Sequence, residues 1–166
     1  MRDAMKISKP EEQAMRLVMR MATHADQATL GELSALERLP EPTVAKLLGR
    51  LRQGGIVEVQ RGRNGGYVLA LPPAEITVAA VIRALGRPLL EGASCSPVDS
   101  LDPECPHAAD CGLRSVWHQV SLRIRDVLES TSVADLTQKE SAVSARLIER
   151  LEPAGTPNVP QGATTS

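Results

Sequence analysis

The segment at residues 56–70 constrains the fold most strongly, because it joins two short strand-like stretches by a glycine-rich turn. Residues 56–60 alternate apolar and polar side chains, residues 67–70 are largely apolar, and residues 61–66 contain three glycines. This arrangement predicts a β-hairpin with arginines at its tip. The 166-residue chain contains one Trp, one Tyr and no Phe, and such an aliphatic composition favours packed helices over a β-sandwich. The hairpin is therefore expected to be a small part of a mainly α-helical protein.

Three helical segments are expected ahead of this hairpin. The first covers about residues 10–25, and the second, residues 30–37, begins at the capping-box pair Thr29 and Glu32. A proline-containing turn at 39–42 separates the second segment from the third, residues 42–53. The side chains expected to face the core are Met15, Val18, Met19 and Ala22 on the first helix and Val44, Leu47, Leu48 and Leu51 on the third. The order helix, short helix, turn, helix and hairpin predicts a winged helix-turn-helix.

A winged helix-turn-helix places its second motif helix in the major groove of DNA and its wing on the flanking backbone. The charge distribution agrees with a polyanionic partner, since residues 1–90 carry 13 Lys/Arg and 9 Asp/Glu, whereas residues 91–166 carry 6 and 11. Guanidinium groups suit phosphate and narrow-groove geometry. The predicted contacts to a double-stranded DNA operator are Thr43, Lys46, Arg50 and Arg52 on the third helix and Arg61 and Arg63 in the wing.

The rest of the chain predicts further helices and one long polar loop. A helix is expected over residues 76–85 with Thr77 as its N-cap, and the length of the loop at 91–110 indicates a function. Residues 112–130 form a predicted helix, and we expect Thr131 to cap a short turn at 132–136. The apolar residues that recur along the 112–130 helix are Leu113, Val116, Trp117, Val120, Ile124, Val127 and Leu128. So wide a stripe predicts a homodimer, because operator DNA is commonly palindromic.

The chain is expected to contain five parts. They are a winged helix-turn-helix DNA-binding domain at 1–90, a cysteine-rich loop at 91–111, a dimerisation helix with its following turn at 112–136, a charged helix at 137–152 and a disordered tail at 153–166. Neither a signal peptide nor an apolar run of membrane-spanning length is recognisable. We therefore expect a cytoplasmic protein without a membrane partner.

Three cysteines, Cys95, Cys105 and Cys111, lie within 17 residues of one another. In a reducing compartment such clustered thiols indicate metal ligands or redox-active groups rather than disulfides. The spacing lacks the paired Cys-x2-Cys of zinc ribbons, and it is compatible with an iron–sulfur cluster, whose thiolate ligands are loosely spaced. Two alternatives stay open, namely a structural zinc site that adds His107 to the three cysteines and a protein without metal.

An enzyme with a cysteine nucleophile would need a histidine and an orienting group close by. The chain has only three histidines, His24, His107 and His118, and no nucleophile signature surrounds any of its cysteines. We therefore do not expect an enzyme.

The sequence resembles the IscR/NsrR family of iron–sulfur winged-helix transcription regulators. The resemblance covers residues 5 to about 136, and its most specific elements are the RGRNGGY wing at 61–67 and the three cysteines downstream. The other matching stretches are residues 12–22, 47–57, 75–85 and 131–136, together with Leu113 and Trp117. The chain differs in the third helix, where it has Thr43-Val44-Ala45 and many relatives have Tyr-Leu-Glu, so the operator sequence cannot be carried over.

The resemblance implies a homodimeric regulator, expected to be a repressor, whose cluster state alters DNA binding. It implies that Cys95, Cys105 and Cys111 are the thiolate ligands of an iron–sulfur cluster, with 2Fe–2S preferred and 4Fe–4S compatible. Some relatives use a His three residues after the last cysteine as the fourth ligand, but Arg114 occupies that position here. Others use a carboxylate from the first helix of the partner subunit, and the matching residue is Glu12. Such a harder, more labile ligand suits the sensing of nitric oxide, oxygen or cluster supply.

Overall fold

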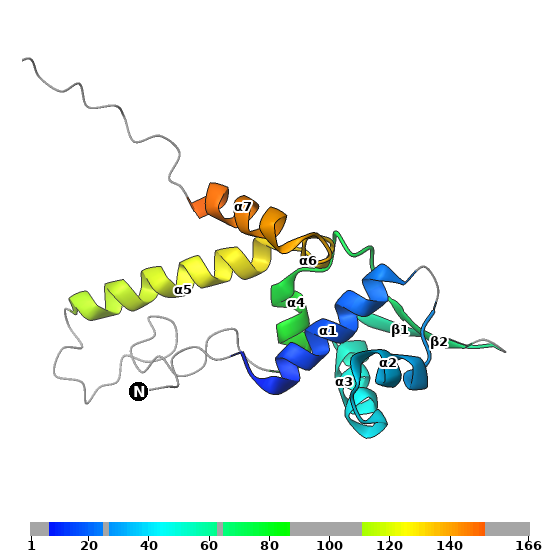
Figure 1. Ribbon diagram of the computed structural model, residues 1–166. Coiled ribbons are helices and arrows are strands. Elements are labelled where there is room, and N and C mark those ends of the chain that lie inside the picture. The colour runs from blue at the N-terminus through cyan, green and yellow to red at the C-terminus, as the bar shows by residue number, and fades with distance from the viewer. Residues whose placement is uncertain (1–6, 25–26, 63–64, 87–110, 152–166) are drawn as a thin grey trace, which may run out of the picture.

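The computed structural model describes residues 7–24, 27–62, 65–86 and 111–151 and confirms a mainly helical chain with a two-stranded antiparallel hairpin (Figure 1). The helices are α1 (Lys9–Thr23), α2 (Leu30–Glu37), α3 (Glu41–Gln53), α4 (Val78–Ala84), α5 (Gly112–Ser130), α6 (Val133–Leu136) and α7 (Glu140–Leu151), and the strands are β1 (Val57–Gln60) and β2 (Gly66–Leu69). The expected helices at 30–37 and 112–130 have the predicted bounds, and the other elements differ by a few residues at their ends. The loop predicted at 91–110 and the tail predicted at 153–166 lie outside the described residues.

Helices α1, α2 and α3 pack with the hairpin around one aliphatic core. Leu17 of α1, Leu33 of α2 and Leu48 of α3 are completely buried in it. The hairpin register pairs Val57 with Leu69 and continues to the pair at the opposite end, Gln60 with Gly66. The core therefore joins the helix-turn-helix to the first residues of the wing.

The hairpin is also tied to the segment between α1 and α2. Tyr67 donates its N–H to the carbonyl of Ala28 at 2.8 Å, and the N–H of Ala28 donates in return to Tyr67 at 3.0 Å. Gly66 permits this approach, because a Cβ built on it would lie 2.8 Å from the carbonyl oxygen of Ala28. The close contact holds the base of the wing against the helical body.

The buried face of α1 differs from the predicted one. The structure buries Ala14, Leu17, Val18 and Met21, whereas Met15 and Ala22 are only partly buried and Met19 is half-exposed. Two ion pairs also join α1 to the buried Glu37 of α2. The guanidinium groups of Arg16 and Arg20 lie 3.0 and 2.7 Å from the two carboxylate oxygens of Glu37 at the end of α2. These arginines are one helical turn apart, so both contact α2 from the same side of α1.

After α5, backbone hydrogen bonds attach the segment between α5 and α6 to the start of α4 in the winged domain. Val78 donates to the carbonyl of Thr131 at 2.9 Å, and Val133 donates to that of Ile76 at 2.8 Å. The prediction that Thr131 caps the following turn is wrong, since its hydroxyl donates to Val127 and Ser132 is the N-cap of α6. Thr131 is buried where its backbone pairs with the start of α4. The next residue, Ser132, forms the capping box of α6 with Asp135.

Helix α5 projects away from the winged domain as a long arm (Figure 1). It is joined to α4 by an ion pair of 3.4 Å between Arg83 and Glu129, near the C-terminal end of the arm. All 19 residues of α5 are described, and none of them is buried. Helix α7 is attached near the same end through ion pairing of Arg146 with Asp135 and a hydrogen bond from Arg150 to the carbonyl of Ser130.

Candidate nucleic-acid interface

Helix α3 has one face in the core and another in solvent. As expected, Val44, Leu47, Leu48 and Leu51 are buried. The exposed residues of α3 are Glu41, Pro42, Ala45, Lys46, Gly49, Arg50, Arg52 and Gln53, and the predicted contact Thr43 is half-buried. Gly49 has no atom within 4 Å of a Cβ built on it, so its backbone is accessible from outside. A partner could therefore approach the middle of α3 closely, which is one reason for a glycine in a helix.

Arg52 and Arg61 share a cleft between the end of α3 and the hairpin. The cleft has a volume of about 440 Å³, and Gly55, Val57, Glu58, Val59 and Ala70 complete its lining. Both arginines are exposed, so the two predicted DNA contacts meet on one concave surface. Glu58 lies in the same cleft and was not predicted as a site residue. Its position became evident only from the hairpin register, which places it opposite Val68.

The predicted wing contacts are described only in part. Gly65 donates its N–H to the carbonyl of Gly62 at 3.0 Å across the turn, and Gly62 has a φ of 144°, a conformation that favours glycine. Arg61 lies next to this turn, whereas Arg63 lies outside the described residues.

Arg50 differs from the other predicted DNA contacts. Its guanidinium group donates a hydrogen bond of 3.2 Å to the backbone carbonyl of Leu85, just after α4. Sequence patterns could not reveal this partner, because any residue presents a backbone carbonyl. The structure thus connects Arg50 to α4, whereas Arg52 and Arg61 line the cleft.

Two of the four predicted metal ligands lie in the described part of the chain. Cys111 is half-buried and is the N-cap of α5, whereas Glu12 is exposed in the first turn of α1. Within the described residues the Glu12 carboxylate makes no hydrogen bond or ion pair, while the carboxylate of neighbouring Glu11 accepts from the N–H of Ser8 at 2.6 Å. Cys95, Cys105 and the alternative ligand His107 lie outside the described residues.

The surroundings of these two residues are compatible with metal ligation. Cys111 lies at the N-terminus of α5, where the helix dipole is favourable to negatively charged groups. Glu12 is accessible to a second subunit, and no described neighbour binds its carboxylate. Of the adjacent residues Glu11 and Glu12, it is therefore Glu12 whose carboxylate is available as a ligand. Among the residues that the structure describes, no group of three metal-binding side chains gathers.

The apolar face of α5 is open to solvent at its N-terminal half. The exposed fractions are 55% for Leu113, 55% for Val116, 45% for Trp117 and 39% for Val120. A run of large apolar side chains exposed along one helix is typical of an interaction surface. This observation agrees with the predicted role of the helix in binding a second subunit.

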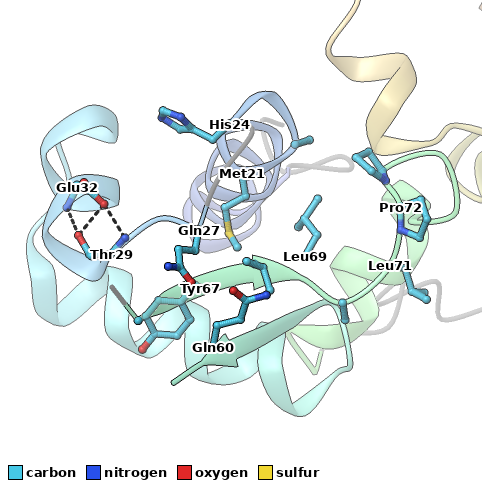
Figure 2. A pocket seen from close by; sticks show the side chains of 15 residues that line it. Met21, His24, Gln27, Thr29, Glu32, Gln60, Tyr67, Leu69, Leu71 and Pro72 are labelled. Atoms are coloured by element: carbon cyan, nitrogen blue, oxygen red, sulfur yellow. Dashed lines mark hydrogen bonds between the residues drawn. The ribbon is translucent and has the colours of Figure 1, made fainter. Parts of the chain in front are cut away.

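A larger open groove of about 1160 Å³ lies between the C-terminal end of α1 and β2 (Figure 2). Met21, Tyr67 and Leu69 line its centre, with Thr29 and Glu32 at one end and Leu71 and Pro72 at the other. Hydrogen bonds from the backbone and side chain of Thr29 lower the pKa of Glu32, so this carboxyl group is ionised as part of the α2 cap. The polar end of the groove is thus explained by helix capping.

Comparison with known proteins identifies relatives of most of the chain. The sequence profile of the Rrf2 family, described as iron-dependent transcriptional regulator, matches residues 7–139. The HTH-type transcriptional regulator CymR of Bacillus subtilis is 32% identical over 134 residues, which are 80% of this chain and 89% of CymR.

Solved structures show the same similarity. A structure of the B. subtilis protein, described as the global cysteine regulator, covers 81% of this chain and 97% of CymR with a TM-score of 0.65 and 30% identity. The structure of T. potens IscR covers 92% of this chain and 94% of that protein, with a TM-score of 0.61 and 25% identity. Within the described residues no helix is long and apolar enough to cross a membrane.

Proposed function

The chain belongs to the Rrf2 family of transcriptional regulators, and from this premise we propose that it is a homodimeric DNA-binding repressor gated by an iron–sulfur cluster. The observation that carries the DNA-binding proposal is the placement of exposed basic side chains, with Lys46 on the exposed side of α3 and Arg52 and Arg61 together in one cleft beside it. The exposed apolar face of α5 supports a dimer, which would present two such surfaces to the half-sites of one operator.

The proposed DNA contacts are Thr43 and Lys46 on α3, Arg52 in the cleft, and Arg61 and Arg63 in the wing. Thr43 is the candidate for a base contact, since its hydroxyl can both donate and accept. The four basic residues are candidates for phosphate contacts, which position a protein on the duplex without reading its sequence.

Operator affinity is expected to depend strongly on salt. Four phosphate contacts in each subunit make about eight in the dimer, and counterion release then gives a log–log slope of roughly −7 for the association constant against salt concentration. Replacing Arg52 or Arg61 by Ala removes two contacts from the dimer, so each variant is expected to reduce the slope by about 2. Fluorescence anisotropy with a labelled duplex at several salt concentrations measures it.

Lys139→Ala is the matched control, because it also removes one positive charge but lies just before α7, away from α3. Its slope should equal that of the wild type. A wild-type complex insensitive to salt, or equal slopes for the arginine variants and the wild type, would contradict this assignment of the surface.

For the metal centre we propose Cys95, Cys105 and Cys111 as thiolate ligands, with Glu12 of the partner subunit as the fourth. Cys111 connects this centre directly to α5, because it is the N-cap of that helix. A bound cluster would therefore join the N-terminal end of one arm to α1 of the other subunit. An iron–sulfur cluster supplies a centre that reacts with oxygen or nitric oxide, and the ligand residues convert its presence into a restraint between subunits.

Anaerobic purification tests this centre and its effect on DNA binding. We expect a brown protein with stoichiometric iron and sulfide, a 2Fe–2S mass by native mass spectrometry, and a change of at least about tenfold in affinity for the chain's own promoter when the cluster is removed. Cys111→Ala should abolish both the colour and this difference. Ser115→Ala, in the first turn of the same helix, is the control and should retain both.

The remaining outcomes separate the alternatives. A colourless protein with one zinc ion per subunit would support a structural site containing His107, and a protein without metal would leave a regulator of another signal. Equal promoter binding by the wild type and by the Cys95→Ala, Cys105→Ala and Cys111→Ala variants would refute gating.

A further inference from the structure

The last turn of α4 contacts the recognition helix α3 through the side chain of Arg50, which was predicted to contact DNA. The last carbonyl groups of a helix have no partner within that helix, and a nearby cation interacts favourably with them. Arg50 supplies such a group to α4, since its guanidinium donates to the carbonyl of Leu85 at 3.2 Å. Leu85 is itself buried, so the bonded carbonyl belongs to a residue anchored in the core.

A steric contact secures the same two helix ends. Gly54, which ends α3, lies so close to Ala84 that a Cβ built on it would be 2.3 Å from the Cβ of Ala84 and 2.8 Å from its Cα. Two adjacent residues of α4 and its cap thus contact two positions one helical turn apart on α3. Such a pair of contacts restrains the rotation of α3 about its axis as well as its distance from α4.

The same turn of α4 also contacts the arm. Arg83 pairs with Glu129 of α5 at 3.4 Å. Three consecutive residues, Arg83, Ala84 and Leu85, therefore connect α5 on one side with α3 on the other. This turn of α4 therefore contacts both the recognition helix and the arm.

We propose that Arg50 is a positioning residue for DNA recognition, which holds α3 at the angle to α4 and α5 that matches the spacing of two operator half-sites. The proposal rests on the proposed DNA-binding dimer and assigns Arg50 a role different from that of Lys46 and Arg52. A phosphate contact contributes to affinity on any duplex. A positioning residue contributes to the discrimination between duplexes whose half-sites are differently spaced.

The test uses the full-length dimer and the two half-sites that the wild type selects from a randomised duplex library. In a series of duplexes the distance between half-sites is one base pair shorter, unchanged or one longer, and each step moves a half-site by roughly 3.4 Å and turns it by about 34°. Affinity and salt slope are measured for the wild type, Arg50→Ala, Arg50→Lys and Lys46→Ala.

For Arg50→Ala we expect about tenfold weaker binding at the preferred spacing, about tenfold less discrimination against the altered spacings, and the wild-type salt slope. Arg50→Lys retains a long cationic donor and should recover most of the discrimination. Lys46→Ala, four residues earlier on the helix, should show the opposite pattern, with a slope reduced by about 2 and the spacing preference intact.

Three results are distinguishable from this expectation. A slope reduced by about 2 in Arg50→Ala with an unchanged spacing preference would make Arg50 a phosphate contact and overturn the proposal. Weaker binding of Arg50→Ala in equal proportion at every spacing, in step with its loss of thermal stability, would assign it a structural role only and overturn the proposal as well. Failure of the wild type to select any duplex would instead refute the proposed function.

Discussion

Replacing Val116 by Glu is expected to convert the protein into a monomer and to weaken operator binding by at least about a hundredfold. Val116 lies on the exposed apolar face of α5, and 55% of its surface is accessible in the single subunit. In the proposed dimer each subunit would bury one carboxylate without a partner, and leaving such a charge uncompensated costs several kcal/mol. Since about 1.4 kcal/mol corresponds to a factor of ten, this penalty weakens association of the subunits by at least about a hundredfold.

The variant should fold normally, because Val116 lies outside the core of the subunit. Analytical ultracentrifugation measures the change in mass, and circular dichroism verifies the helix content. Trp117 provides an independent signal as the only tryptophan in the chain, and its emission should shift to longer wavelength when the dimer dissociates. Ser115→Glu introduces the same charge one residue away, on a different face of α5, and should remain dimeric. A dimeric Val116→Glu protein would show that the subunits associate elsewhere.

Replacing Gly54 by Ala is expected to lower the free energy of unfolding by about 2–3 kcal/mol, the range of an overpacked contact. The backbone of Gly54 has a φ of −82°, which any residue adopts, so the effect is steric. The new methyl group would overlap Ala84, whose Cβ would be 2.3 Å away. Thermal denaturation at a fixed protein concentration should show a melting temperature lower by roughly 5–10 °C.

Gly49→Ala is the matched control in α3, since nothing lies within 4 Å of its added methyl group. It should raise the free energy of unfolding by about 1 kcal/mol, because Ala favours a helix interior over Gly. In the double variant Gly54→Ala/Ala84→Gly part of the overlap is relieved, and stability should recover in part. A Gly54→Ala protein as stable as the wild type would mean that α3 and α4 separate at little cost, and the positioning role of Arg50 would then lose its steric support.

Those features of the fold that depend on local chemistry could be predicted from the sequence. The start of α2 follows from Thr29 and Glu32, which form the predicted capping box. The hairpin follows from alternation and glycines, and its strands end at the pair Gln60 and Gly66 on either side of the glycine-rich turn. These signals lie within a few residues of the structure that they specify, so one sequence suffices to detect them.

Features that depend on distant partners were missed. Helix α1 contains apolar side chains on more than one face, so its periodicity could not show that Leu17 and Met21 are buried. Arg16 of α1 also pairs with Glu37, which lies 21 residues further along the chain. Arg50 is a predicted DNA contact by its charge and its helix, but the sequence could not show that it donates a hydrogen bond to the backbone carbonyl of Leu85, 35 residues away. A sequence pattern shows which hydrogen bonds a side chain is able to make. Which acceptor it bonds to depends on how distant segments pack together in the folded chain.

The open face of α5 also has a consequence for evolution. None of the 19 residues of this helix is buried in its own subunit, so their identities are largely free of the requirements of folding the winged domain. After a gene duplication, substitutions along this face could separate two sister regulators in one cell by making mixed pairs unfavourable, without altering either DNA-reading surface. The arm would then determine which subunits meet, and partner choice could diverge independently of operator choice.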